Sequence, residues 1–386
     1  MKKIVIIGML IAAITLTGCW SAKELNTMSL VMGVGIDKTT ELDHLLLTAQ
    51  VAKPEAVQGA SSDGKKGSGG KAYSNISMVG DTVFEAIRKT THIIGKRLFF
   101  THNEIVILGR SLAEDGLENV IDFFLRDHEL RPNMLVAVAT ENAADIFAVD
   151  SETEKLPITN IIKTIRAHQY ASHFTAVTIF DLTEQLMSET TTPVVPLLSI
   201  TQSRGVKEVE ALGMAVFKYG KMVGILNETE TRGLLWVKGD VKGGSILIDS
   251  PDGKGKVSLE ISKADSEIKP EIRNGQVIMH IKISESAALA EQTTEKNLAT
   301  LEFVKDVERL QANVIKQEIL AALNKSKQFN SDIFGFGNIV YRKFPNDWQI
   351  FRHQWDKVYT DIDCVIDVDA KIRSTGTLSD TVQLRK

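Results

Sequence analysis

The sequence predicts an α+β protein with about three successive mixed domains, in which sheets flanked by helices follow a cleaved lipoprotein signal. Three observations lead to this fold class. A charged and then apolar segment opens the chain, short strand-like and helix-like segments alternate after it, and long strand pairs with one long amphipathic helix fill the second half. With 386 residues, of which 43% are hydrophobic and 24% charged, the chain has the composition of an ordinary globular protein.

The first segment has the layout of a bacterial lipoprotein signal. Lys2 and Lys3 precede an apolar run from 4 to 16 that is too short for a good membrane span. The run ends in Leu16-Thr17-Gly18-Cys19, the pattern at which a cysteine thiol is acylated and the preceding residues are removed. We therefore expect residues 1–18 to be a signal peptide and Cys19 to carry a stable lipid anchor. An ordinary signal peptide with a chance cysteine is the less favoured alternative.

The segment 19–201 is expected to be an N-terminal α/β region, with a possible division into two subdomains near 150–156. The predicted strands cover 29–37, 42–51, 73–79, 104–108, 134–139 and 193–200. The predicted helices cover 81–94 with Asp81 as its cap, 112–128, 142–149, 157–169 with Pro157 in its first turn, and 180–188. Residues 53–71 are rich in Gly, Ser and Lys and predict a flexible loop.

After a change in composition at 202–207, the segment 208–386 is expected to be a C-terminal α+β domain. The predicted strands cover 211–217, 222–226, 245–249, 257–263, 268–273, 277–284 and 361–373, and the predicted helices cover 228–236 and 295–324. Asp252-Gly253 and Asn274-Gly275 supply the positive-φ residues of tight turns. The last strand alternates strictly between apolar and mostly charged residues, which predicts one buried and one solvated face.

No motif in the sequence indicates catalysis, a cofactor or a metal. Gly33-Val34-Gly35 lacks the third glycine of a dinucleotide loop, and the histidines do not have zinc-site spacing. The aspartates along 361–369 are better interpreted as a solvated strand face than as a calcium site. Cys364 lies on the apolar face of the same strand and is expected to be buried and inert. The net charge of −4 and the absence of a basic cluster argue against a nucleic-acid partner.

One further segment, Asp332-Ile-Phe-Gly-Phe-Gly-Asn338, has an unusual composition. Asp332 is expected to cap a helix whose apolar face includes Phe336, although Gly335 and Gly337 each weaken that helix by roughly 1 kcal/mol. Such a cost indicates that another backbone comes close. Asp332, Gly335, Phe336 and Gly337 are therefore candidates either for packing within the domain, which the apolar spacing favours, or for docking of a partner.

Several of these segments together resemble one protein family. Cys19-Trp20 with Glu24-Leu25-Asn26, the strand end Gly33-Val-Gly-Ile-Asp37, the segment at Asp332, and Ile372-Arg373-Ser374-Thr375-Gly376 are similar to the GerAC, or Ger(x)C, family of spore germination lipoproteins. The resemblance implies the C subunit of a nutrient germinant receptor, held on the outer face of the spore inner membrane. It further implies assembly with membrane-embedded A and B subunits, a mixed α+β body and no enzyme activity.

Two other classes of protein remain as alternatives. A lipoprotein that binds a solute for a permease would also be anchored, but the sequence lacks two repeated parallel-sheet lobes. An anchored hydrolase is disfavoured because no nucleophile motif is present.

Overall fold

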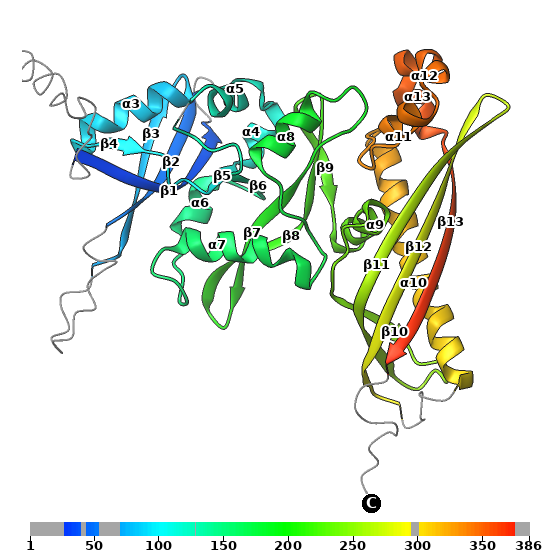
Figure 1. Cartoon of the computed structure of the whole chain (residues 1–386). Coiled ribbons are helices and arrows are strands. Elements are labelled where there is room, and N and C mark those ends of the chain that lie inside the picture. The colour runs from blue at the N-terminus through cyan, green and yellow to red at the C-terminus, as the bar shows by residue number, and fades with distance from the viewer. Residues whose placement is uncertain (1–26, 40–43, 54–69, 128, 295–300, 375–386) are drawn as a thin grey trace, which may run out of the picture.

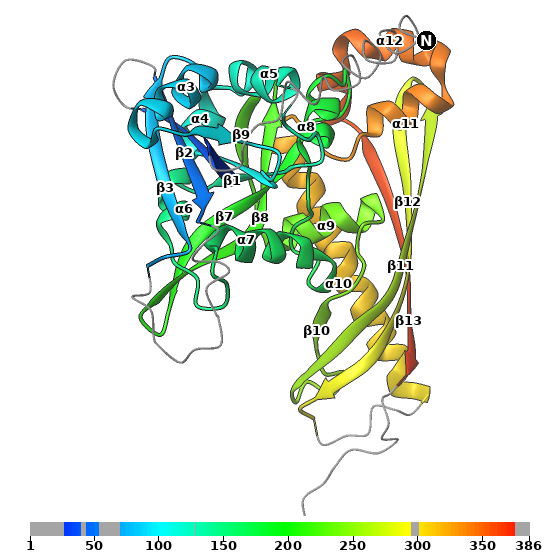
Figure 2. The same cartoon turned by 60° about the vertical axis from the view of Figure 1, so that its left-hand side comes forward.

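The structure, a computed structural model, describes residues 27–39, 44–53, 70–127, 129–294 and 301–374. These residues form two sheets that lie at opposite ends of the molecule, with helix α9 (Glu228–Lys238) between them (Figures 1 and 2). The first sheet and its helices span the N-terminal half of the chain, and the second sheet packs against the long helix α10 (Leu301–Gln328). The mixed α+β fold class is confirmed.

The first sheet has a parallel centre and antiparallel edges. Its strand order is β3-β2-β1-β5-β6-β7-β8-β9, and β4 pairs separately with β1. The strands are β1 (Met28–Lys38), β2 (Leu45–Ala52), β3 (Tyr73–Gly80), β4 (Arg97–Phe99), β5 (Ile105–Leu108), β6 (Leu135–Ala139), β7 (Val194–Ser203), β8 (Val206–Lys218) and β9 (Lys221–Leu226). β1, β5, β6 and β7 run parallel to one another, and their core segments are buried because helices cover both faces.

Two layers of helices cover this sheet. The helices are α3 (Val83–Ile94), α4 (Arg110–Asp115), α5 (Glu118–Arg126), α6 (Ala143–Ala148), α7 (Pro157–Arg166) with a 3₁₀ turn (Ala167–Tyr170), and α8 (Ile179–Leu186). α6 and α7 lie on one face, and α3, α4, α5 and α8 lie on the other (Figure 1). Gly33 and Gly35 of β1 make room for the first layer, since a Cβ at either position would overlap Ile158 of α7 or Phe147 of α6.

The second sheet has the order β10-β11-β12-β13, and only its last pair is parallel. Its strands are β10 (Ser245–Asp249), β11 (Lys256–Arg273), β12 (Gln276–Gln292) and β13 (Asp363–Ser374). Asn274 and Gly275 connect β11 to β12 with φ of 53° and 78°, as their sequence predicts. α10 packs along this sheet, and β13 alternates between exposed and more buried residues as expected for a strand covered on one face.

Three short helices lie near the hairpin end of the second sheet (Figure 2). They are α11 (Phe336–Lys343), α12 (Pro345–Phe351) and α13 (Trp355–Thr360), with a 3₁₀ turn at Arg352–Gln354. Pro345 occupies the first turn of α12, where its missing N–H costs nothing.

The structure corrects several predicted elements. The N-cap of α3 is Thr82 rather than Asp81, and its hydroxyl accepts a hydrogen bond from the Glu85 amide at 3.1 Å. The single helix predicted over 112–128 is two helices, because Gly116 with φ 141° ends the first. The two strands predicted at 257–263 and 268–273 form one continuous strand, since the polar residues between them lie in an exposed part of a long hairpin.

The predicted boundary at 202–207 falls at the β7–β8 hairpin, whose turn holds Arg204 and Gly205 at positive φ. β8 and β9 follow this turn and still belong to the first sheet. The division of the chain into domains stays a prediction. The predicted loop at 53–71 lies almost wholly outside the described residues, as do the signal segment and Cys19.

Candidate functional site

Asp332 lies at the joint between the two halves of the molecule and is buried. Its Oδ1 accepts a hydrogen bond from the Phe336 amide at 2.9 Å, and its Oδ2 accepts one from the Gly337 amide at 2.8 Å. The indole Nε1 of Trp355 donates to the same Oδ2 at 3.1 Å. Asp332 therefore satisfies the first amides of α11, as predicted, and also ties that helix to α13.

Burial raises the pKa of Asp332 to about 6, although the hydrogen bonds from Gly337, Phe336 and Trp355 act in the opposite direction. The carboxylate is enclosed by backbone amides and aromatic rings, and among the described residues its hydrogen-bond donors are amides and an indole N–H rather than cations. Such an arrangement stabilises a chain conformation and offers no open coordination position to a substrate.

The two glycines of this segment have different structural roles. Gly335 is the N-cap of α11 with φ 72°, so the prediction that it lies within the helix is wrong. Its positive φ, rather than a tolerated loss of helix stability, accounts for a glycine there. Gly337 lies in the first turn of α11, where a Cβ would come within 2.8 Å of Thr190 Cβ and 2.9 Å of the Trp355 ring. Its small size permits close approach of these two side chains, whereas the sequence predicted another backbone there.

Phe336 anchors an aromatic cluster that joins α11, α12 and α13. Its ring stacks on Phe334 with centroids 5.0 Å apart and lies 6.2 Å from Tyr359. Trp355 packs edge-on against Trp348 at 5.0 Å. Phe336 is almost completely buried, so it is inaccessible to a partner in this conformation.

The motif also contacts the loop that leads into β7. The Thr192 amide donates to the carbonyl oxygen of Asp332 at 3.0 Å. Nearby, Asp356 of α13 accepts from Lys218 Nζ and Tyr219 Oη of the β8–β9 turn, both at 2.8 Å. Asp332, Lys218 and Trp355 line a hollow of only about 90 Å³, which has room for a few water molecules. The segment 332–337 thus lies where the second half of the chain packs on the first.

A second connection between the halves was not identified from the sequence. Glu318 of α10 is buried and accepts hydrogen bonds from Arg232 Nε at 2.9 Å and Trp236 Nε1 at 2.7 Å, both on α9. Arg232 also pairs with Glu318 through its Nη2. A Cβ at Gly233 would lie 1.9 Å from the Glu318 carbonyl oxygen, so the glycine permits contact between the helices. The Glu at position 318 interrupts the apolar stripe of α10, which is the one sequence signal for this network.

The residues considered for a dinucleotide loop, a metal site or a nucleophile lie in surroundings that do not favour those roles. Gly33 and Gly35 face helix side chains rather than an open loop. Among the described residues, no group of three His, Cys, Asp or Glu side chains is arranged to hold a metal ion. Cys364 is half-buried, and desolvation raises the pKa of its thiol to about 12, so it is a poor nucleophile.

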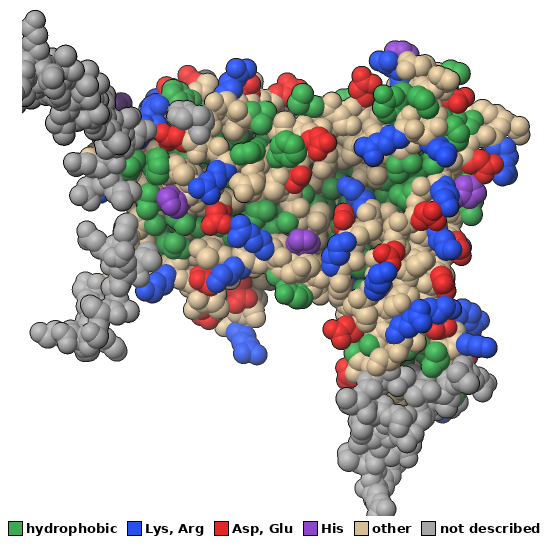
Figure 3. All heavy atoms as spheres, in the orientation of Figure 1, with side chains coloured by type: hydrophobic (Ala, Val, Ile, Leu, Met, Phe, Trp, Pro, Cys, Tyr) green, Lys and Arg blue, Asp and Glu red, His purple; other side chains and the backbone are tan. Residues whose placement is uncertain are grey.

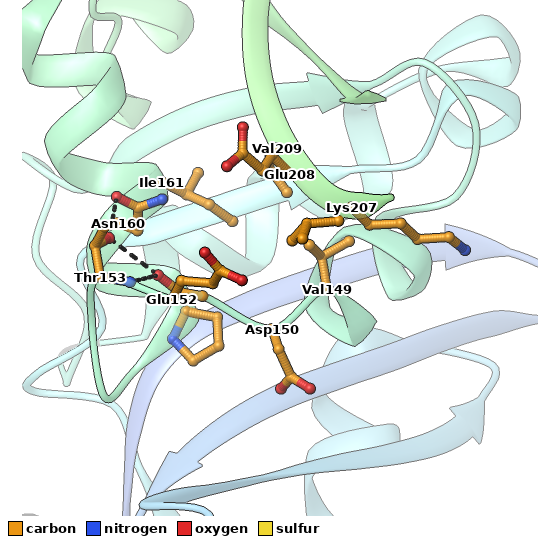
Figure 4. A pocket seen from close by; sticks show the side chains of 12 residues that line it. Val149, Asp150, Glu152, Thr153, Asn160, Ile161, Lys207, Glu208 and Val209 are labelled. Carbon is orange, nitrogen blue, oxygen red and sulfur yellow. Dashed lines mark hydrogen bonds between the residues drawn. The ribbon is translucent and has the colours of Figure 1, made fainter. Parts of the chain in front are cut away.

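A hollow of about 80 Å³ lies beside the linker that connects α6 to α7 (Figure 4). Glu152 and Thr153 of the linker, Asn160 of α7 and Glu208 of β8 line it (Figure 4). Thr153 Oγ1 donates to Asn160 Oδ1 at 3.3 Å, so these two side chains are partly engaged with each other. The hollow is far smaller than the roughly 300–1,000 Å³ of typical small-molecule sites.

Two family models match the chain. The model described as spore germination protein N-terminal domain matches residues 21–200, and that described as spore germination B3/GerAC like, C-terminal, matches residues 212–376. Together with the mixed α+β fold, these matches define the class of the chain as a spore germination protein. The chain belongs to the GerAC, or Ger(x)C, family.

Curated relatives from Bacillus subtilis (strain 168) are similar over nearly the whole chain. Spore germination protein KC is 29% identical, with 99% of this chain and 98% of the relative covered. Spore germination protein B3 is 23% identical, with 95% and 96% covered, and spore germination protein A3 is 25% identical, with 97% and 98% covered. The crystal structure of the GerBC protein has the same fold, with a TM-score of 0.58 and 20% identity over 88% of this chain and 97% of that chain.

Cys19 lies outside the described residues, and its acylation stays a prediction. None of the helices in the described ranges combines the length and apolar character needed to cross a membrane.

Proposed function

We propose that this chain is the lipid-anchored, non-catalytic C subunit of a spore nutrient germinant receptor. It would assemble with membrane-embedded A and B subunits on the outer face of the spore inner membrane and help trigger germination. The observation that carries the proposal is the full-length similarity to spore germination proteins over both halves of the chain. The Leu16-Thr17-Gly18-Cys19 segment supports the lipid anchor.

Substitution of the anchor cysteine tests the proposal. Cys19→Ala should leave an unacylated and uncleaved precursor, because no other thiol lies near the processing site. Nutrient-triggered germination should fall. Cys364→Ala is the matched control, since it removes the other thiol of the chain but leaves the processing site unchanged. Palmitate uptake and full germination by the Cys19→Ala variant would contradict the anchor.

The partners are tested by purification. When the tagged chain is isolated from detergent-solubilised spore membranes, the A and B subunits should come with it in stoichiometric amounts. Recovery of the chain alone, under conditions that keep it acylated and folded, would contradict the proposed assembly.

A solute-binding lipoprotein is the competing function. Among the described residues the two sheets differ in strand order and direction, so they do not form the pair of similar lobes that closes around a solute. Calorimetry of the purified chain with amino acids and sugars separates the two functions. Saturable binding of a nutrient, with a permease recovered in place of the A and B subunits, would favour the competing function.

A further inference from the structure

We infer that one edge of the molecule, formed by α3, α5, α8 and α12, lies against the lipid bilayer. The inference rests on the lipid anchor of the proposed function and adds the orientation of the body on the membrane. Figures 1 and 2 place these four helices along the same edge. We call this surface the membrane edge and define it by its exposed apolar side chains, Phe84, Leu125, Phe180, Met187 and Ile350.

The membrane edge carries five of the large apolar side chains that are exposed among the described residues. The five side chains are between 48% and 81% exposed, and they come from four separate helices or their caps. The space-filling view shows hydrophobic side chains interspersed with charged ones along this upper edge (Figure 3). Large exposed apolar residues gathered on one face indicate an interaction surface. Side chains of this kind insert at the boundary between lipid headgroups and acyl chains.

Contacts between the elements make the membrane edge continuous. α3 packs on α5, where Phe84 and Phe123 have ring centroids 6.5 Å apart, and α5 packs on α8. Arg352, which follows α12, lies 3.8 Å from Glu189 in the loop after α8. This ion pair bridges the two halves of the molecule. The edge therefore extends from α3 in the first half of the molecule to α12 in the helical cluster of the second.

Only a short stretch of sequence separates the predicted anchor at Cys19 from one end of this edge. Eight residue steps separate Cys19 from Thr27, the first described residue. Even a fully extended chain of that length reaches only roughly 28 Å. Met28 then pairs with Arg97 of β4, two residues after Gly95, the C-cap of α3. The body must consequently lie close to the bilayer at the α3 end of the membrane edge.

Charged side chains of the four helices do not select anionic lipid. Six of them are acidic, and three are Lys or Arg. Two of these bases pair within their own helices, since Lys89 lies 2.8 Å from Glu85 and Arg126 lies 2.6 Å from Asp122. The exposed apolar side chains and the short connection to Cys19 therefore place this edge at the bilayer.

The test uses the full acylated chain, without other receptor subunits, in vesicles of phosphatidylcholine and phosphatidylglycerol. Cys364→Ser removes the free thiol, and single cysteines are then placed by Phe180→Cys or Ile350→Cys and labelled with an environment-sensitive fluorophore. Leu247→Cys is the matched control, because Leu247 is an exposed apolar residue of β10, outside the edge. Nitroxide-labelled lipid should quench emission at 180 and 350 about twofold more than at 247.

The outcomes separate the orientation from the anchor. If Cys19 is not acylated and the protein does not float with the vesicles, the proposed anchor fails. If the protein floats but positions 180 and 350 are quenched no more than 247, the membrane edge is refuted. Self-quenching between labels without lipid quenching would instead show that the edge binds a second copy, and would also refute it.

Discussion

The two sheets bury their strands in different ways. In the first, β5 and β6 are buried at every residue because helix layers cover both faces. In the second, β12 and β13 alternate between buried and exposed residues because α10 covers one face. The sequences follow this difference, with Ile-Val-Ile-Leu in β5 and alternating charges in β13. The hydrophobic pattern of a strand therefore indicates how many of its faces are covered by other elements.

The halves also differ in their buried carboxylates. Asp37 in the first half accepts hydrogen bonds from the Ala143 and Ala144 amides at 2.6 and 2.9 Å, so both of its oxygens are engaged. Glu285 in the second half pairs with Gln311 through one oxygen, and among the described residues its Oε1 has no hydrogen-bond partner. We therefore expect changes in the second half to alter stability and its pH dependence most.

The largest effect is expected where α9 joins α10. Glu318→Ala leaves Arg232 largely buried without its partner, which should lower the free energy of unfolding by about 3–5 kcal/mol. Denaturant unfolding followed by tryptophan fluorescence measures the change. Lys316→Ala, at an exposed position of the same helix, is the control and should have little effect. A loss below 1 kcal/mol for Glu318→Ala, roughly that of a surface pair, would show that the network is not essential.

The next largest loss of stability is expected for Gly337→Val, because the valine side chain would overlap Thr190 and Trp355. The expected loss is about 3 kcal/mol, the upper part of the usual cost of overpacking. Asn338→Val is the control, since it places the same branched side chain on the same helix at a partly exposed position. We propose that the segment 332–337 is a packing motif. Unchanged thermal unfolding of Gly337→Val together with loss of partner subunits from spore membranes would instead make it a docking site.

Glu285 should make stability depend on pH. Burial raises the pKa of its carboxyl to about 8 from an ordinary 4.5, so between these values the folded chain holds a proton that the unfolded chain releases. The contribution of Glu285 to the free energy of unfolding is therefore fully present below pH 4.5, and it is lost as the pH rises towards 8 and the buried carboxyl ionises. Glu285→Gln keeps the neutral form, so at pH 9 the variant should be more stable than the parent by roughly 1–2 kcal/mol.

The measurement is the difference in unfolding free energy between parent and Glu285→Gln across pH 5 to 9. Because Asp332 and other titrating groups are common to both proteins, their contributions cancel in that difference. Asp37→Asn in the first half provides the comparison, as Asp37 has both oxygens hydrogen-bonded to amides. A difference for Glu285→Gln that does not change with pH would refute a proton held by this carboxyl.

The smallest effect is expected in the first half. β2 and β3 already pair up to Ala52 and Tyr73, and the Lys53 amide donates to the Ala72 carbonyl at 2.8 Å. Deletion of residues 58–70 shortens a connection whose ends are held together. Each halving of loop length changes the free energy of loop closure by only about 0.6 kcal/mol. The body should stay folded. A fall in melting temperature of more than about 8 °C would show that the segment contributes to the fold.

The sequence by itself determined most of the strands and helices and several of the turns, but it did not predict β4, α12, α13 or the break at Gly116. Local signals were sufficient for this, such as the alternation in 361–373, Pro157 at the start of α7 and Asn274-Gly275 between β11 and β12. The family could also be recognised, because its short segments are contiguous in the chain. A crowded position at Gly337 was predicted for the same reason, since a glycine in a helix is a local anomaly, but the neighbours are side chains and not the predicted backbone.

Only the tertiary structure decided what those segments meet. The pairing of Glu318 with Arg232 and Trp236 joins residues 82 to 86 positions apart, and Asp332 reaches Trp355 across 23 positions. Hydrophobic periodicity cannot identify such partners, because it records which face of an element is buried and not what covers it. The conformation of Gly335 was missed for a related reason, since a positive φ depends on the path of the chain into α11 and leaves no periodic signal in the sequence.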